Sequence, residues 1–340
     1  MKRDSPRSHT SHMPMEAIMP DTPRKENVSI VTTLYYSAPY LEEFYERCKS
    51  AALKLYERYE FIFVNDGSPD DSLAVAMRIH ERDPRVKIID LSRNFGHHKA
   101  IMTGLMNVRG DHVFLMDCDL EESPEWLPEF LEEMERTNAD VVYGVQRARK
   151  GGLLERLTGY VFYRLFNAAA GITIPANLIT ARLMTARYVR ALVQHTDHLP
   201  FLAGLWQITG FEQAPLTVEK KSKGTSSYTT ARKIGIVIDS ITSFSVKPLS
   251  YIFLMGCFFI FLSCCSIGFV LVRYFFYQIT IDGWTSLIIS LWLFGGLTLF
   301  SIGVIGVYLS RVLMEVKPWP FTIIRRIYSR QDEAAERHGD

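Results

Sequence analysis

The sequence predicts an α/β domain with a mostly parallel, doubly wound sheet, followed by two transmembrane helices. Strand-like apolar segments alternate with helical segments from residue 28 to about residue 145, which is typical of a parallel sheet covered by helices. Acidic turns directly follow two of these strands, where such sheets bind ligands. Residues 251–272 and 284–308 carry no charge, and each stretch is long enough to cross a bilayer.

Composition excludes a nucleic-acid partner and favours a reducing compartment for the main domain. The 340 residues carry a net charge of +1, with no zinc-finger spacing and no basic-aromatic tract, so an electrostatic footprint for nucleic acid is missing. The five cysteines show no metal-type pair spacing, and we interpret them as reduced. Residues 1–27 are rich in Ser, Pro, His and Arg, which predicts a disordered tail rather than a signal peptide.

Side-chain spacing predicts the first elements. Residues 28–36 are β-branched and aromatic, which is typical of a strand. Pro39 can occupy a first helical turn, and residues 40–59 then place five small or apolar side chains on one helical face: Leu41, Phe44, Cys48, Ala52 and Leu55. Residues 61–64 form a second buried strand, and the turn at residues 65–72 opens another helix.

The same alternation continues along the chain. Strands are predicted at residues 86–91, 112–116 and 140–145, and helices at residues 99–108 and 125–136. His97 and His98 precede one of these helices. We interpret them as a polar helix start rather than as metal ligands.

The fourth strand ends in a cluster of carboxylates. Asp117 and Asp119 are two residues apart and Glu121 follows in phase, so all three lie on one side of an extended chain. Mg²⁺ or Mn²⁺ would relieve their repulsion and bring substrate phosphates; the alternative is a solvated loop. Asp66 lies in a turn at the same sheet edge, where the alternative is a helix cap. Two acidic clusters at one edge favour a nucleotide site.

The second half contains two basic loops, at residues 147–152 and 220–228. Each is either a phosphate-binding loop or a solvated one. Residues 153–170 and 177–192 are predicted helices. Residues 229–249 have apolar side chains among polar ones, which fits either an amphipathic helix at a bilayer surface or an ordinary packed helix.

Charge around the two apolar stretches predicts their orientation. Residues 250–310 form a two-helix transmembrane hairpin, because the first stretch alone reaches ~33 Å as a helix. The loop at residues 273–283 carries only two charged side chains, whereas basic residues are concentrated at the outer flanks: Lys247, Arg311, Lys317, Arg325, Arg326 and Arg330. The positive-inside rule then places the catalytic domain, both termini and the tail at residues 311–340 in the cytoplasm.

Several motifs, in order along the chain, resemble those of family 2 inverting glycosyltransferases. They are Val64–Ser72, Leu91–His97 and Gly110–Glu121, and the membrane-anchored branch is matched by Val142–Val145, Gly224–Tyr228 and Gly303–Tyr308. Within that family the chain is similar to the polyprenyl-phosphate group, which includes dolichol-phosphate mannose synthase and bactoprenol glucosyltransferase. The resemblance covers about residues 28 to 328.

This resemblance implies a GT-A fold over residues 28–228, a cytosolic nucleotide-sugar donor such as a UDP-sugar, and a polyprenyl (undecaprenyl) phosphate acceptor in the inner membrane. It also implies a divalent metal, Mg²⁺ or Mn²⁺, a role in cell-envelope glycan or lipid modification, and a homo-oligomer in some members.

The resemblance further implies roles for single residues. Asp66 and Arg93 would contact the donor nucleotide, Asp117 the nucleotide sugar, and Asp119 the metal, with Glu121 completing the metal site. Asp117, Asp119 and Arg182 would be the catalytic residues. Five residues would hold the lipid phosphate and the diphosphate: Arg147, Arg149, Arg182, Lys221 and Ser226.

Three positions depart from the family pattern. Asn65 replaces the first Asp of Asp-Asp-Gly-Ser, Thr180 occupies the place of an acidic residue proposed as a base, and Lys221 stands where Arg is common. These departures bear on donor choice and acceptor recognition and leave the metal motif intact. A phosphate nucleophile is already anionic, so it needs positioning more than deprotonation.

Two other hypotheses remain open. The chain could transfer sugar to a different lipid or a growing polysaccharide, although the Gln-x-x-Arg-Trp motif of processive synthases is missing from the sequence. It could instead be a non-catalytic membrane partner that keeps the fold. The intact carboxylate cluster argues against that alternative.

Overall fold

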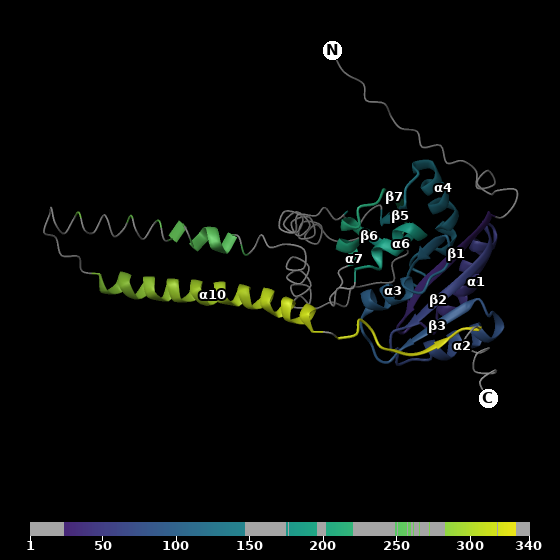
Figure 1. The fold of residues 1–340 in the computed structure, drawn as a ribbon, viewed down its shortest axis with the longest axis horizontal. Coiled ribbons are helices and arrows are strands. Elements are labelled where there is room, and N and C mark those ends of the chain that lie inside the picture. Colours follow the sequence, from purple (N-terminus) through teal and green to yellow (C-terminus); the bar gives the residue numbers. More distant parts are fainter. Residues whose placement is uncertain are drawn as a thin grey trace, which may run out of the picture.

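The computed structural model describes residues 24–146, 177–195, 202–219, 283–317 and 319–330, together with residue 175 and isolated positions between 249 and 272. Over these residues the chain forms one eight-stranded sheet with helices on both faces, and a long helix extends away from it (Figure 1). The predicted α/β class is therefore confirmed.

The sheet has the strand order β7-β5-β6-β4-β1-β2-β3-β8. The strands are β1 (Arg24–Leu34), β2 (Tyr56–Asn65), β3 (Val86–Leu91), β4 (His112–Leu115), β5 (Val141–Gln146), β6 (Leu178–Thr185), β7 (Gln213–Val218) and β8 (Ile324–Tyr328). β1 pairs in parallel with both β2 and β4. β6 and β8 run antiparallel to their neighbours, so the sheet is mixed but mostly parallel.

Helices cover both faces of the sheet. The helices are α1 (Leu41–Leu53), α2 (Ser72–Arg82), α3 (His97–Leu105), the 3-10 helix η2 (Pro124–Trp126), α4 (Leu127–Thr137), α6 (Ala186–Leu192), α7 (Leu202–Ile208) and α10 (Trp284–Val316). Side chains of α1, α2 and α4 pack with Phe61 and Phe63 in one apolar core. Side chains of α3, α6 and α7 pack with Ile62 and Val64 in the other, because successive strand residues face opposite sides.

Three predicted boundaries are wrong. Residues 177–192 are not one helix, because Leu178–Thr185 forms β6, which pairs on both sides with β4 and β5 before α6 begins. Pairing on two sides outweighs the local helical spacing. The predicted helix at residues 40–59 ends at Leu53, since the chain enters β2 at Tyr56. β1 begins at Arg24, earlier than the predicted start at Val28.

The C-terminal segment contains a strand that the sequence analysis did not predict. β8 follows α10 in the chain and pairs antiparallel with the edge strand β3, joining Ile88 to Tyr328 and Asp90 to Arg326. Ser92 continues the contact beyond β3 by donating its N–H to the carbonyl of Ile323 (2.9 Å). The predicted tail at residues 311–340 is therefore in part a component of the eight-stranded sheet.

Helix α10 supports one of the two predicted membrane spans. Among the described residues, it is the one helix whose length and composition would allow it to cross a bilayer, with its apolar window at Leu293–Met314 and none of that window buried. A helix that is apolar on all sides and unburied suits a lipid environment. The other predicted span, at residues 251–272, is described only in part, as helix at residues 251–256, 258, 259, 261, 265 and 272. The predicted helices at residues 153–170 and 229–249 lie outside the described residues except for residue 249.

Candidate active site

The C-terminal ends of β1, β2 and β4 meet at one edge of the sheet, as the parallel register requires. His97, the first residue of α3, joins two of these strand ends. Its Nδ1 lies 3.0 Å from the hydroxyl of Thr33 and its Nε2 lies 3.4 Å from Asp117 Oδ1. His97 is thus a polar helix start, as predicted, and it also contacts one of the predicted catalytic carboxylates.

Asp66 fixes the loop that leads into α3. Its side chain is buried, and its two carboxylate oxygens accept the backbone N–H groups of Phe95 (2.7 Å) and Gly96 (3.0 Å). Burial raises the pKa of the Asp66 carboxyl, and the two N–H groups act against that rise. Asp66 therefore shapes the ligand edge from beneath, through the backbone at residues 95–96.

The predicted metal residues lie together in sequence but do not surround a common point. Asp119 Oδ1 accepts the N–H of Glu121 (3.0 Å), and Leu120 between them has a positive φ of 60°. Within the described part of the chain, no three His, Cys, Asp or Glu side chains are placed to hold a metal together. Asp117 and Asp119 are half-buried at the edge. Two carboxylates still fit Mg²⁺ or Mn²⁺, because these ions are usually held by one or two carboxylates plus substrate phosphates.

Glu122 is a site residue that the sequence analysis missed. It is fully buried, and its carboxylate accepts the N–H of Thr180 (3.1 Å) and, at 3.4 Å, that of Asp117. It therefore joins the end of β4 to β6. The signal was present, since Glu122 directly follows Glu121, but sequence spacing does not distinguish a buried carboxylate from an exposed one.

Arg182 lies beneath this edge rather than on the surface. It is 1% exposed, donates to the carbonyls of Thr180 and Ile179 (both 3.0 Å), and lies against the ring of Trp206. Burial lowers the pKa of Arg182 to about 9, and the negative charges of Glu122 and Asp117 oppose that fall. The guanidinium is thus a cation at neutral pH, placed behind the carboxylates.

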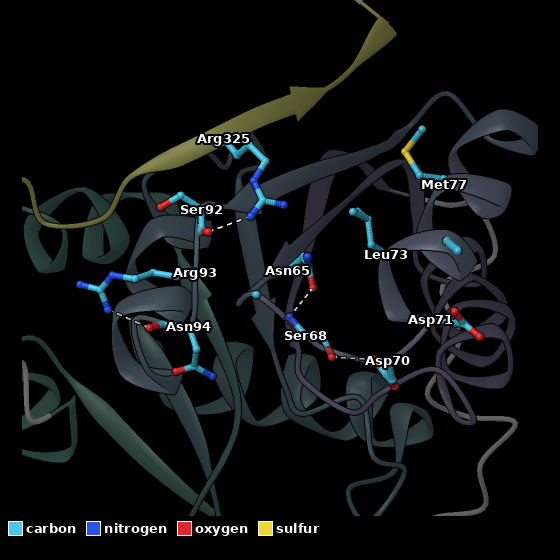
Figure 2. A pocket seen from close by; sticks show the side chains of 12 residues that line it. Asn65, Ser68, Asp70, Asp71, Leu73, Met77, Ser92, Arg93, Asn94 and Arg325 are labelled. Carbon is cyan, nitrogen blue, oxygen red and sulfur yellow. Dashed lines mark hydrogen bonds between the residues drawn. The ribbon is translucent and has the colours of Figure 1, made fainter.

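A pocket of about 630 Å³ lies beside this edge, on the α2 side of the sheet. Figure 2 shows Leu73 and Met77 of α2 along one wall, Asn65 and Ser68 at its centre, and Arg325 of β8 above them. The turn at residues 65–68 lines this pocket, and its Gly67 packs against the backbone of residues 93–94. A Cβ at Gly67 would lie 2.5 Å from that backbone, and its φ is +59°, so only glycine fits there.

Comparison with known proteins gives the family. The model for glycosyl transferase family 2 matches residues 29–192. A Mycobacterium tuberculosis (strain CDC 1551 / Oshkosh) protein described as a glycosyltransferase is 48% identical over 301 residues, 88% of each chain. The Bacillus subtilis (strain 168) glycosyltransferase YkcC is 35% identical over 90% of this chain and 95% of its own. The chain belongs to glycosyltransferase family 2.

Two further relatives have more specific names. The bactoprenol glucosyl transferase of Shigella phage SfV is 28% identical to this family 2 glycosyltransferase over 88% of this chain and 98% of its own. Among solved structures, a Mycobacterium tuberculosis glucosyl-3-phosphoglycerate synthase in complex with Mn²⁺, UDP-glucose and phosphoglyceric acid aligns with a TM-score of 0.46. It shares 14% identity over 69% of this chain and 83% of that chain.

The departure at Asn65 has a structural reason in this glycosyltransferase. Asn65 is buried, its amide donates to Asp90 Oδ1 (2.7 Å), and its carbonyl oxygen accepts the N–H of Ser68 (3.2 Å). Asp90 is buried as well, and its other oxygen lies 3.3 Å from Arg325. An aspartate at position 65 would place two carboxylates side by side away from water, so the amide suits this neighbour.

Replacing Asn65 with Asp is therefore expected to destabilise the domain by about 2 kcal/mol at pH 7, because a donor becomes a second buried carboxylate. The double variant Asn65→Asp, Asp90→Asn restores an amide beside a carboxylate and is expected to recover at least half of the loss. Thermal unfolding of the detergent-purified protein measures both effects. A double variant no more stable than Asn65→Asp would contradict this account.

Two tyrosines were predicted to lie in the first strand, but β1 ends at Leu34 and they follow it. Tyr35 and Tyr36 are 49% and 60% exposed, with ring centroids 4.9 Å apart. Tyr36 has a φ of 55°, and its N–H donates to Ser68 Oγ (2.8 Å). This left-handed conformation costs a side chain about 1–2 kcal/mol, so the fold holds the exposed aromatic ring beside the ligand edge at some cost in stability.

The remaining predicted residues divide into two groups. Arg93 is exposed, lies 4.1 Å over the ring of Phe95, and donates to the carbonyl of Asn94 (3.0 Å). It is therefore next to the backbone that Asp66 holds. Apart from Arg182, the predicted phosphate-binding residues lie outside the described residues: Arg147, Arg149, Lys221 and Ser226.

Proposed function

We propose that this family 2 glycosyltransferase moves one sugar from a nucleotide-sugar, a UDP-sugar, to a polyprenyl phosphate such as undecaprenyl phosphate at the cytoplasmic face of the inner membrane. The observation that carries the proposal is an unburied apolar helix, α10, joined by a short segment to a strand of the catalytic sheet. Such a connection keeps the site close to a bilayer. Relatives named bactoprenol glucosyl transferase align along almost their whole length, which supports a lipid acceptor.

In this proposal the lipid phosphate attacks the anomeric carbon and the nucleoside diphosphate leaves with inversion at that carbon. The acceptor is already anionic, so binding and orientation supply most of the catalysis. Thr180 in place of an acidic base is compatible with such an acceptor. Asp117 would orient the sugar, and His97 would fix Asp117 through their 3.4 Å contact.

Asp119 would hold a divalent cation, Mg²⁺ or Mn²⁺, with Asp117 beside it and Glu121 fixing the turn. When bound, that cation would neutralise charge that develops on the departing diphosphate. Arg182 would add positive charge from beneath the edge, where it interacts electrostatically with the carboxylates of Glu122 and Asp117. Four further residues are proposed to hold the lipid phosphate and the diphosphate from the basic loops: Arg147, Arg149, Lys221 and Ser226.

A radiolabel transfer assay tests the proposed function. Membranes containing the protein receive polyprenyl phosphate, Mn²⁺ or Mg²⁺, and a panel of labelled UDP- and GDP-sugars. We expect label in the lipid phase with one donor, and loss of that label when a chelator removes the metal. Label in a polymer fraction would favour the polysaccharide acceptor instead. No transfer with any donor would favour the non-catalytic alternative.

A further inference from the structure

The segment that follows α10 contacts the catalytic domain at the loop beside the proposed donor site. Thr322 shares a hydrogen bond with Thr103 of α3 (3.0 Å), and Ile323 accepts the N–H of Ser92 (2.9 Å). β8 then pairs with β3. The chain therefore returns from the apolar helix to the stretch just before Arg93.

Within this segment, Arg325 makes the most specific contacts. Its guanidinium donates to the carbonyl of Ser92 (2.7 Å; Figure 2). It also lies 3.3 Å from Asp90 Oδ2. Asp90 is buried, whereas Arg325 is exposed on the pocket side. A planar guanidinium that binds two acceptors at once fixes their relative positions, so Arg325 holds the peptide immediately before Arg93.

The same contacts extend to the second loop of the site. Asp90 accepts the amide of Asn65 (2.7 Å), and Asn65 in turn accepts the N–H of Ser68 (3.2 Å). Gly67 packs against the backbone of residues 93–94. Arg325 is therefore connected, through side-chain hydrogen bonds and backbone packing, to both loops that border the carboxylate edge.

We propose that Arg325 is a positioning residue for donor binding, which makes the C-terminal strand part of the donor site. It acts through Ser92 and Asp90 on the loops that carry Arg93 and Asp66, and it does not itself need to contact the reacting atoms. This inference rests on the proposed function, since it assigns donor binding to those loops. It adds to the donor site a residue that follows the apolar helix in the chain and lies outside the family motifs.

The test compares Arg325→Ala, Arg325→Lys and the control Arg326→Ala in the full-length protein in detergent. Arg326 lies on the same strand, over the ring of Tyr328, and is not among the residues that line the pocket. Titration calorimetry measures the affinity for UDP and GDP with Mn²⁺, thermal unfolding reports stability, and the transfer assay gives KM for the donor and kcat.

We expect Arg325→Ala to weaken nucleotide binding and raise the donor KM by roughly tenfold, with kcat changed less than threefold. Arg325→Lys keeps the charge but lacks the planar fork, so it is expected to restore thermal stability and not donor affinity. Arg326→Ala should bind nucleotide like the wild type.

The outcomes are distinguishable. If Arg325→Ala binds nucleotide with an affinity within twofold of the wild type, the positioning role of Arg325 is overturned, while the proposed function is not. An equal loss of affinity in Arg325→Ala and Arg326→Ala would also overturn it, because the effect would then belong to β8 as a whole. A wild type that binds neither UDP nor GDP would overturn the proposed function and this role with it.

Discussion

Asp119→Ala is expected to reduce sugar transfer by at least on the order of 10³-fold while the protein stays folded and membrane-bound. The side chain is half-buried at the C-terminal edge of the sheet, and its carboxylate accepts the backbone N–H of Glu121. Its removal costs little packing but takes away the proposed metal ligand. Transfer of labelled sugar into the lipid phase measures the loss, and thermal unfolding checks the fold.

Asp111→Asn is the matched control for this prediction. Asp111 lies just before the opposite end of the same strand, where it accepts the N–H of Asn27 (3.0 Å). Neutralising it changes the charge of the domain equally without touching the ligand edge. Transfer by Asp119→Ala at the wild-type rate would refute the metal assignment, and equal losses in both variants would show that only charge or folding was affected.

Asp83→Ala is expected to destabilise the domain by ~3 kcal/mol, the largest stability effect that we predict for one side chain. Asp83 is buried after α2, where it accepts the hydroxyls of Tyr45 (2.8 Å) and Tyr59 (2.9 Å) and is paired with Arg85 (2.8 Å). Removing the carboxylate leaves two buried hydroxyls without their acceptor, and each such loss costs about 1–3 kcal/mol. The ion pair with Arg85 adds little to the stability, because the Arg85 side chain is half-exposed and water screens its charge.

This destabilisation should depend on pH. Burial alone would raise the pKa of Asp83, but hydrogen bonds from Arg85 and the two tyrosines outweigh it and lower that pKa well below its usual range. A carboxyl with a lowered folded-state pKa contributes stability above its unfolded pKa of ~3.9 and loses that contribution as the pH falls further. The stability gap between the wild type and Asp83→Ala should therefore be constant near neutrality and narrow below about pH 4.

Chemical denaturation in detergent at several pH values measures both effects, with Asp71→Ala as an exposed control at the start of α2. A gap that widened on acidification would contradict the account of Asp83. A stability loss in Asp71→Ala as large as that in Asp83→Ala would show that the loss of a negative charge, rather than of the buried network, is responsible.

The sequence was sufficient for the parallel half of the sheet. β1 to β4 are dominated by apolar residues buried on both faces, so composition alone marks them as strands. Because their C-terminal ends must share one edge, the placement of Asp66 and Asp117 at that edge also followed. Both conclusions depend on local composition and on the geometry of parallel strands.

Other features depend on contacts between distant segments. β6 has helical spacing, and its identity comes from pairing with β4 and β5. Arginine is a residue type that often binds phosphate, yet the carbonyls of β6 and the ring of Trp206 enclose the side chain of Arg182. β8 contains two arginines and looks like a charged tail until β3 is placed beside it. No pattern within a window of a few residues contains this information.

The position of β8 also sets the order in which the domain can be completed during synthesis. Its partner β3 is made early, but β8 emerges after α10, more than two hundred residues later in the chain. Until then β3 has an unpaired edge, and open strand edges promote pairing with other chains. The nascent chain must therefore keep that edge protected until β8 is made, and a ribosome that stalls within α10 would leave an aggregation-prone domain.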